Sequence, residues 1–299
     1  MVSTNSFYFN IGGVPEHFNI PFKKGIDEGA FSLKNIELYW KDYKGGTGDL
    51  VKALNNNEID IGILLTEGAI KAISDDNKFK IVQIYVNTPL TWGVYVDSSS
   101  TIQSEKDVLS PQFCISRYGS GSHLMAYLLC QREHWDVSSI QFEVIDNFIG
   151  ALKFMPSHPD HLFMWETFMT KPYVDSETLK KITEIPTPWP SFSIVVKEDF
   201  IEKYPEVLYQ FLLTTASYTY KFKQNTIESI EYLSNYFDFS IEDMKVWLAR
   251  TDWNYVIDPP QNKVSKALTF LKSIQLISEE MTEEKVCISQ NFWDKFPLS

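Results

Sequence analysis

The sequence predicts an α/β protein of two lobes, in which the chain crosses from the first lobe to the second and back. Short β-rich runs alternate with helical runs from residue 7 to about residue 90, which is typical of βαβ units around a parallel sheet. A second series of this kind begins near residue 113, after a polar break at 98–104. The 299-residue length, with 44% apolar residues, is enough for two hydrophobic cores.

The first series alternates strands with two helices. Strands are predicted at 7–11, 36–40, 59–64, 79–87 and 90–97. Helices are predicted from about Pro15 and from about Gly48. Pro15 suits a first helical turn, and Gly29 suits the end of that helix because glycine adopts a left-handed backbone at little cost. The first helix is therefore expected to be about 14 residues long.

The second series ends in a proline-rich segment, and its strands are predicted at 113–116, 140–145 and 162–165. Because prolines favour extended backbone in their neighbours, residues 185–190 are expected to form the return crossover. A strand from Phe192 and an amphipathic helix from Pro205 follow. We therefore assign lobe I to residues 1–92 and 192–299 and lobe II to residues 97–187. The hinge strands are assigned to residues 93–96 and 188–191.

Charge and hydropathy limit the possible partners. The formal net charge is −12, whereas a protein that binds nucleic acid or an anionic membrane needs a clustered basic face. No uninterrupted apolar stretch reaches the roughly 18 residues of a membrane-spanning helix. We therefore expect a small-molecule ligand, no nucleic acid and no membrane insertion. Whether a transporter or another protein is a partner stays open at this point.

The cysteines and the first residues bear on location. The start lacks a basic segment followed by an apolar one, so no secretory signal is predicted. Cys114, Cys130 and Cys287 are odd in number and lie in apolar surroundings, which favours buried free thiols in a reducing compartment. We expect a cytoplasmic protein, or a periplasmic one if a signal peptide has been removed.

Several segments, in order, resemble one family of binding proteins. They run from Ile11 to His17, Lys44 to Leu54, Asn57 to Gly62, Ser116 to Ser122 and Val195 to Val207, and the likeness covers most of the chain. The family contains bacterial aliphatic-sulfonate and taurine binding proteins and the fungal thiamine-pyrimidine synthases. The resemblance implies a periplasmic-binding-protein-like fold of type II with two crossover strands, in a divergent cytosolic fungal branch.

The synthase branch of this family implies an enzyme, but its chemical residues are not matched. Those synthases carry a pyridoxal-phosphate lysine, a histidine one helical turn later, and a cysteine-rich cluster before the returning strand. This chain has Leu64, Gly68 and residues 186–191 at these positions. Without the lysine amine no Schiff base can hold the cofactor. We expect no cofactor and no catalytic residue, with an enzyme of thiamine-pyrimidine biosynthesis or related cofactor-dependent chemistry as the alternative.

Candidate ligand-binding residues follow from the rule that loops at the carboxyl ends of parallel strands line the crevice of an open sheet. In lobe I the rule selects Gly12, Gly13, Val14, His17, Gly46, Thr47, Thr66 and Glu67. In lobe II it selects Ser116, Arg117, Tyr118, Gly119, Ser120 and Ser122. Glycines there let a ligand approach the backbone, and helix starts nearby direct N–H groups at an anion; alternatively, the glycines only make tight turns.

Individual side chains have two interpretations each. Arg117 could form a bidentate pair with a carboxylate, sulfonate or phosphate, or else a surface or lobe-to-lobe salt bridge. Trp92, Tyr118, Trp165 and Trp189 fall near predicted hinges or strand ends, where they could stack on a flat ligand or pack in the core.

The remaining candidates are acidic or imidazole groups. Glu166 could bind a ligand amine or cap the next helix. His17 could donate a hydrogen bond to a ligand, or be a half-exposed helix residue. His158 and His161 flank Pro159 in a short cluster, which we interpret as a loop and not as a metal site.

These observations predict non-catalytic binding of a small, anionic or heteroaromatic metabolite in the cleft between two lobes, with hinge-like closure. A regulatory domain whose closure is read by another protein is a further alternative.

Overall fold

The computed structural model describes residues 6–237 and 239–296 and divides into two compact units. Unit 1 comprises Met1–Thr88 and Trp189–Ser299, and unit 2 comprises Pro89–Pro188. The chain thus passes between the units after Thr88 and after Pro188, a few residues from the positions expected from the sequence. Residues 93–96, expected as a hinge strand, lie within a strand of the unit 2 sheet.

Unit 1 is built on a five-stranded sheet in the order β2-β1-β3-β10-β4. The strands are β1 (Phe7–Gly13), β2 (Ile36–Asp42), β3 (Ile61–Leu65), β4 (Phe79–Val86) and β10 (Phe192–Lys197). Strands β1, β2 and β3 are parallel, as predicted, whereas β10 runs antiparallel to both β3 and β4. The sheet is therefore mixed, because the chain re-enters unit 1 at the edge where β3 ends and β10 must run back from it.

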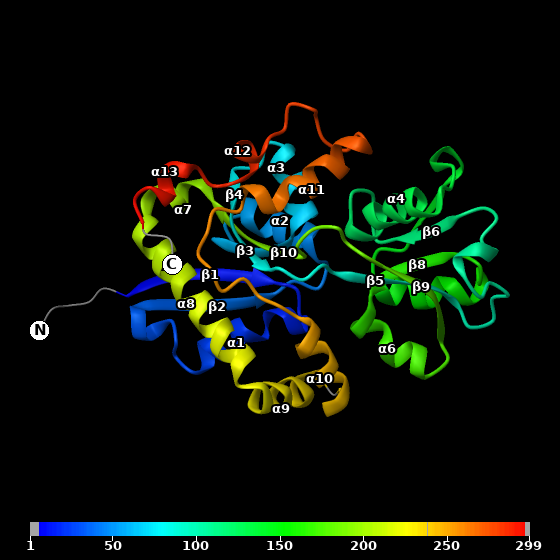
Figure 1. Cartoon of the computed structure of the whole chain (residues 1–299), viewed down its shortest axis with the longest axis horizontal. Coiled ribbons are helices and arrows are strands. Elements are labelled where there is room, and N and C mark those ends of the chain that lie inside the picture. Colours follow the sequence, from blue (N-terminus) through cyan, green and yellow to red (C-terminus); the bar gives the residue numbers. More distant parts are fainter. Residues whose placement is uncertain (1–5, 238, 297–299) are drawn as a thin grey trace, which may run out of the picture. The chain divides into compact units, whose positions relative to one another are not determined.

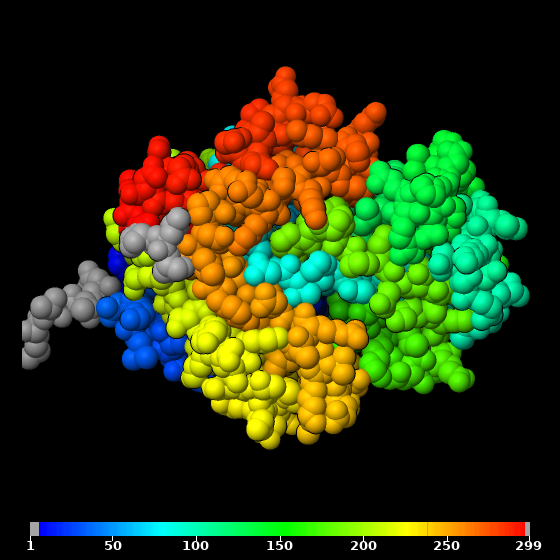
Figure 2. Space-filling view, in the orientation of Figure 1, coloured from blue at the N-terminus to red at the C-terminus, as the bar shows by residue number. Residues whose placement is uncertain are grey.

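Helices cover both faces of this sheet. They are α1 (Ile20–Asp27), α2 (Thr47–Asn55), α3 (Thr66–Ser74), α7 (Glu198–Lys203), α8 (Pro205–Gln224), α9 (Thr226–Phe237), α10 (Ile241–Arg250), α11 (Gln261–Ser273), α12 (Glu283–Val286) and α13 (Gln290–Trp293). Figure 1 shows α1 and α8 on one side of the sheet and α2, α3 and α11 on the other. Residues after about 200 cover most of the face of unit 1 that Figure 2 shows.

The first helix differs from its prediction at one end. A 3-10 turn at His17–Asn19 precedes α1, so the α-helix begins at Ile20 and not at Pro15. Gly29 has a φ of 70°, which confirms the left-handed residue expected after the helix. The helix from Pro205 is also confirmed as α8, whose Phe211 stacks on Phe22 of α1 and on Phe31. These rings fill the space between α8 and α1.

Unit 2 has a second five-stranded sheet, in the order β7-β6-β8-β5-β9. Its strands are β5 (Thr91–Asp97), β6 (Gln112–Ile115), β7 (Gln141–Val144), β8 (Leu162–Glu166) and β9 (Leu179–Pro186), and its helices are α4 (Gly121–Glu133), α5 (Phe148–Phe154) and α6 (Thr167–Asp175). Strand β9 was not predicted, because it lies at the edge of the sheet and carries charged residues. Strand β5 is antiparallel to β8 and β9.

The two sheets have the same arrangement. In each, three parallel strands are followed by one antiparallel strand and a fifth strand beyond it. The antiparallel strand, β10 or β5, is in each case the strand by which the chain enters from the other unit. This correspondence matches β1, β2 and β3 with β6, β7 and β8.

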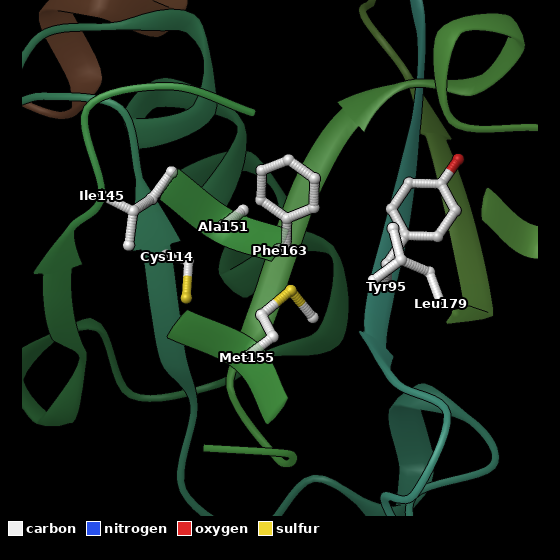
Figure 3. Packing of buried hydrophobic residues seen from close by; sticks show 7 residues of the cluster. All are labelled: Tyr95, Cys114, Ile145, Ala151, Met155, Phe163 and Leu179. Atoms are coloured by element: carbon white, nitrogen blue, oxygen red, sulfur yellow. The ribbon is translucent and has the colours of Figure 1, made fainter. Parts of the chain in front are cut away.

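The core of unit 2 lies around its sheet (Figure 3). Strands β5, β6, β8 and β9, helix α5 and the residues on either side of α5 contribute one cluster of buried side chains: Tyr95, Cys114, Ile145, Ala151, Met155, Phe163 and Leu179. Each of these residues is at most 6% exposed. Burial of apolar side chains against one another is the main stabilising contribution to such a unit.

Within residues 6–237 and 239–296, no helix combines the length and the apolar character needed to cross a bilayer.

Candidate functional site

Both chain connections start and end at the carboxyl edges of the sheets. Because β4 runs antiparallel to β10, it ends at the same edge as β3, and residues 87–90 lead from it to β5. Strand β9 likewise ends at the edge where β8 ends, and residues 187–191 lead to β10. The Thr187 N–H donates to the Leu90 carbonyl at 2.9 Å, and the Ser191 N–H donates to the Thr88 carbonyl at 3.2 Å. The two connections are therefore hydrogen-bonded to each other.

The loop after β1 brings Gly12, Gly13 and Val14 to the carboxyl edge of unit 1. A Cβ on Gly13 would lie 2.7 Å from both Asn19 Nδ2 and Trp40 Cη2, and Asn19 Nδ2 donates to the Val14 carbonyl at 2.9 Å. Gly12 and Gly13 are themselves buried. The structure thus favours the tight-packing interpretation: these glycines make room for protein side chains.

The next two loops of unit 1 lie side by side. Gly46, with a φ of 68°, precedes α2, and Thr47 is its first residue. A Cβ on Gly68, in the first turn of α3, would lie 2.7 Å from the Thr47 methyl carbon. The starts of α2 and α3 are therefore in contact at this edge, as the rule for open sheets predicts.

Glu67 and Trp189 form a buried pair. Trp189 Nε1 donates to Glu67 Oε2 at 2.8 Å, and the two residues are each 1% exposed. Burial raises the pKa of Glu67 to about 7, while the bonds from its own backbone N–H and from Trp189 act in the opposite direction. Trp189 also packs on Phe270 of α11, with 5.2 Å between ring centroids. Both residues lie inside unit 1.

Thr66 and Leu64 are also internal. Thr66 Oγ1 lies 2.9 Å from Ser193 Oγ of β10, and the Thr66 N–H donates to the Ser191 carbonyl. Leu64, at the position of the synthase lysine, is fully buried in β3 opposite Ser193. This position faces the protein core, where an apolar side chain is favoured.

His17 is neither on a loop surface nor half-exposed. Its ring is fully buried and stacks on Trp247 of α10, 4.8 Å between centroids, with Phe237 and Phe239 close by. Burial lowers its pKa to about 3. The half-exposed interpretation is corrected, because α9 and α10 fold over the 3-10 turn that carries His17, and the sequence gives no sign of that packing.

In unit 2, three serine hydroxyls meet at the start of α4. Ser122 Oγ accepts from the Ser116 N–H at 3.0 Å and lies 3.3 Å from Ser116 Oγ and 3.1 Å from Ser120 Oγ. Ser120 is the N-cap of α4, its Oγ accepting from the His123 N–H. The loop after β6 is thus folded onto the first turn of a 13-residue helix, whose first N–H groups have no partner within the helix.

The same loop presents side chains outward. Tyr118 is 65% exposed, Arg117 is half-buried, and Gly119 has a φ of 76°. The Gly119 N–H donates to His123 Nδ1 at 3.0 Å, which attaches the loop to the first turn of α4. Glycine is favoured at Gly119 because other residues rarely adopt this backbone conformation.

The end of β8 supplies an aromatic side chain and a buried acid. Trp165 is half-buried between Phe148 and Phe163, each 5.7 Å away between centroids. Glu166 is the N-cap of α6, accepting from the Met169 N–H at 2.9 Å, as the capping interpretation predicts. Burial raises the pKa of Glu166 to about 7.

Trp92 pairs opposite Glu166 in the sheet of unit 2 and is 6% exposed. Of the four aromatic candidates, Trp92 and Trp189 are therefore core residues, whereas Tyr118 and Trp165 are open to solvent to different degrees. Sequence spacing alone could not separate the two groups.

The cysteines are buried in the protein interior, whereas His158 lies in the predicted loop. Cys114, Cys130 and Cys287 are buried and free, and burial raises their pKa values to about 12. His158 stacks on Phe154 with 3.9 Å between centroids. Within the described parts of the chain, no three His, Cys, Asp or Glu residues are grouped as metal ligands would be.

Two residues that position the loops of unit 2 were not predicted. His123 accepts from the Gly119 N–H, and Asn147, the N-cap of α5, accepts from the Gly150 N–H at 3.1 Å. Asn147 stands directly before the apolar run that forms α5, which is an N-cap signal that the sequence does contain.

Comparison with known proteins agrees with this architecture. Residues 92–185 match the model of the Ca3427-like periplasmic-binding-protein family. The chain is 27% identical to the CA3427 gene product of Candida albicans, with a TM-score of 0.84 over 96% of this chain and 95% of that one. That protein is described as defining a new family with the generic periplasmic-binding-protein fold. No curated protein sequence matches the chain.

Bacterial binding proteins share the fold at lower identity. The alkanesulfonate-binding protein of Xanthomonas axonopodis, bound to MOPS, is 11% identical with a TM-score of 0.79 over 96% of this chain and 99% of that one. The nitrate-binding protein of Synechocystis is 13% identical with a TM-score of 0.71 over 97% and 88%. The chain therefore has the periplasmic-binding-protein-like fold of type II, and its residues 92–185 resemble the Ca3427-like family.

Proposed function

We propose that the protein binds a small, anionic or heteroaromatic metabolite at the carboxyl edges of its two sheets and does not transform it. One observation carries the proposal: over nearly its whole length, the chain shares its fold with a protein that is bound to MOPS, a sulfonate with a heterocyclic ring. Ligands of open α/β sheets bind at the carboxyl edge. Both connections of this chain run between such edges and are only four or five residues long.

Unit 2 provides the groups suited to an anion. The start of α4 offers backbone N–H groups, and Arg117 lies in the loop immediately before the N-cap Ser120. An anion at this position would be favoured by the helix dipole and by a charge-assisted bond from the guanidinium. Tyr118 and Trp165 are the two aromatic candidates with exposed ring surface for a flat ligand.

The absence of catalysis rests on residue identity. Leu64 and Gly68 stand where the related synthases have a lysine and a histidine. The proposal therefore includes no cofactor. The cytoplasmic location stays a prediction from the cysteine pattern.

The test begins with native mass spectrometry of the freshly purified protein, in which a co-purified ligand gives a mass difference that is lost on denaturation. Calorimetric titration with MOPS then follows for the wild type, for Arg117→Ala and for Arg250→Ala. Arg250 is exposed at the end of α10 in unit 1 and is the matched control.

We expect Arg117→Ala to raise the dissociation constant by about tenfold to 150-fold, the effect of losing a charged hydrogen bond of roughly 1.5–3 kcal/mol. Arg250→Ala should bind as the wild type does. A protein that carries no ligand and binds neither MOPS nor nitrate would contradict the proposal. Equal weakening by both arginine variants would reject the site at α4 and leave binding itself supported.

A further inference from the structure

The return connection is attached to α3 at two points, and one of them is an ionisable group. Residues 187–191 enter unit 1 at Trp189, whose Nε1 donates to Glu67 Oε2 at 2.8 Å. Two residues later, the Ser191 carbonyl accepts from the Thr66 N–H at 3.0 Å. Thr66 and Glu67 are the first two residues of α3, so a single helical turn holds the segment.

The carboxyl group of Glu67 is poorly suited to carry a charge in this position. Among the described residues, Glu67 Oε1 has no hydrogen-bond partner and is buried, while Oε2 has the Trp189 indole. An ionised carboxylate in an apolar environment with one side-chain donor is costly, whereas the neutral acid is tolerated. The state of the connection is thus sensitive to one proton.

No charged neighbour offsets that cost. The elements packed against α3 are β3, β4, β10, α2, α11 and α12. With α3 itself, they carry the following ionisable side chains: Lys71 on α3, Lys80 and Tyr85 on β4, Lys197 on β10, Asp49 and Lys52 on α2, three lysines (263, 266 and 272) on α11, and Glu283, Glu284 and Lys285 on α12. The pKa of Glu67 responds to none of them, but only to burial, its own backbone N–H and Trp189.

We propose that Glu67 is a proton-operated latch on the return connection. As a neutral acid it holds Trp189 and keeps residues 187–191 on α3, and loss of its proton loosens this segment. Any change in the relative arrangement of the two units must alter the backbone of the two connections, residues 87–90 and 187–191. The latch therefore makes such changes easier at neutral pH than at acidic pH, whichever ligand the protein takes.

The direction follows from proton linkage. In the latched state the pKa of Glu67 is about 7, and in a loosened, hydrated segment it returns toward the ordinary value of 4.5. Between these values the latched state holds a proton that the loosened state has lost, so loosening becomes tenfold more favourable per pH unit and levels off above pH 7. From pH 5 to pH 7.5 the opening equilibrium rises about fiftyfold.

Hydrogen exchange with mass spectrometry on the full chain measures this equilibrium directly. After correction for the intrinsic rate, the amides of Thr187 and Ser191 should lose about fiftyfold in protection from pH 5 to pH 7.5. The amides inside β3 serve as the internal reference and should keep theirs. Glu67→Gln preserves an acceptor for Trp189 without a charge, so its connection should stay protected at both pH values.

Two further variants separate the latch from general effects. Trp189→Phe keeps a ring against Phe270 but lacks the N–H, and its connection should already be loose at pH 5. Glu166→Gln removes a buried acid of unit 2 that also has a raised pKa, and it should leave the pH dependence at residues 187–191 unchanged. The proposal is overturned if the wild-type connection is equally protected at both pH values, if Glu67→Gln shows the same loss, or if Trp189→Phe is as protected as the wild type at pH 5.

Discussion

Replacing Glu166 by glutamine should change how the stability of the protein depends on pH. Glu166 is 5% exposed, and burial raises its pKa to about 7, compared with 4.5 ordinarily. Between those values the folded protein retains a proton that the unfolded chain has released, so this group contributes stability at low pH that is lost as pH rises toward 7. From pH 5 to pH 7.5 the loss is about 2 kcal/mol, which follows from a fiftyfold change in the equilibrium.

Glutamine is neutral throughout this range, and its amide oxygen can still accept from the Met169 N–H that Glu166 caps at 2.9 Å. The stability of Glu166→Gln relative to the wild type should therefore rise by about 2 kcal/mol between pH 5 and pH 7.5. All other groups titrate equally in both proteins and cancel in the comparison.

The assay is urea denaturation at both pH values, followed by tryptophan fluorescence and circular dichroism. Glu143→Gln, at an exposed position on β7, shows the effect of the same exchange on a solvated side chain. A stability difference between Glu166→Gln and the wild type that does not change with pH would refute the reasoning, since it would mean that the buried acid does not exchange its proton on unfolding.

Four other substitutions test the loops and the aromatic cluster. Between pH 6.5 and pH 4.5 the imidazole of His17 should lower the stability of the wild type by about 2 kcal/mol, because it has a pKa of about 3 when buried and gains a proton only on unfolding. His17→Phe should abolish this contribution, and urea denaturation at both pH values measures it. Gly119→Ala and Gly29→Ala, both at positive φ with nothing within 4 Å of a new Cβ, should each cost about 1 kcal/mol in thermal melts, and only the first should weaken MOPS binding. Ser122→Ala leaves the Ser116 N–H without its acceptor and should destabilise the protein by about 1–3 kcal/mol in urea denaturation; wild-type stability would show that this loop rearranges freely.

The sequence predicted most of the strands and the fold class because buried strands such as β3 and β4 are short, nearly continuous apolar runs between polar segments. It did not predict the direction of β10, since a strand of continuous apolar residues reads the same in either orientation. Strand β9 was not predicted because charged residues interrupt its apolar pattern, and such residues are typical of a strand at the edge of a sheet.

For the candidate residues, too, the sequence predicted roles that depend on near neighbours in the chain and missed those that depend on distant ones. The N-cap role of Glu166, one of the two interpretations open from the sequence, depends only on its position before a helix, which is local information. The burial of His17 depends on α9 and α10, which lie more than 200 residues further along the chain. The Glu67 to Trp189 bond joins residues 122 apart, so no local pattern could reveal it.

The position of β10 has a consequence for the order in which the protein is made. This strand lies between β3 and β4 in the sheet of unit 1, yet it is synthesised only after all of unit 2. While the chain emerges from the ribosome, β3 and β4 must wait for their common neighbour, whereas unit 2 is continuous and complete by residue 188. Unit 2 can therefore fold first, and until β10 is synthesised the edges of β3 and β4 that face it lack their native partner in the sheet.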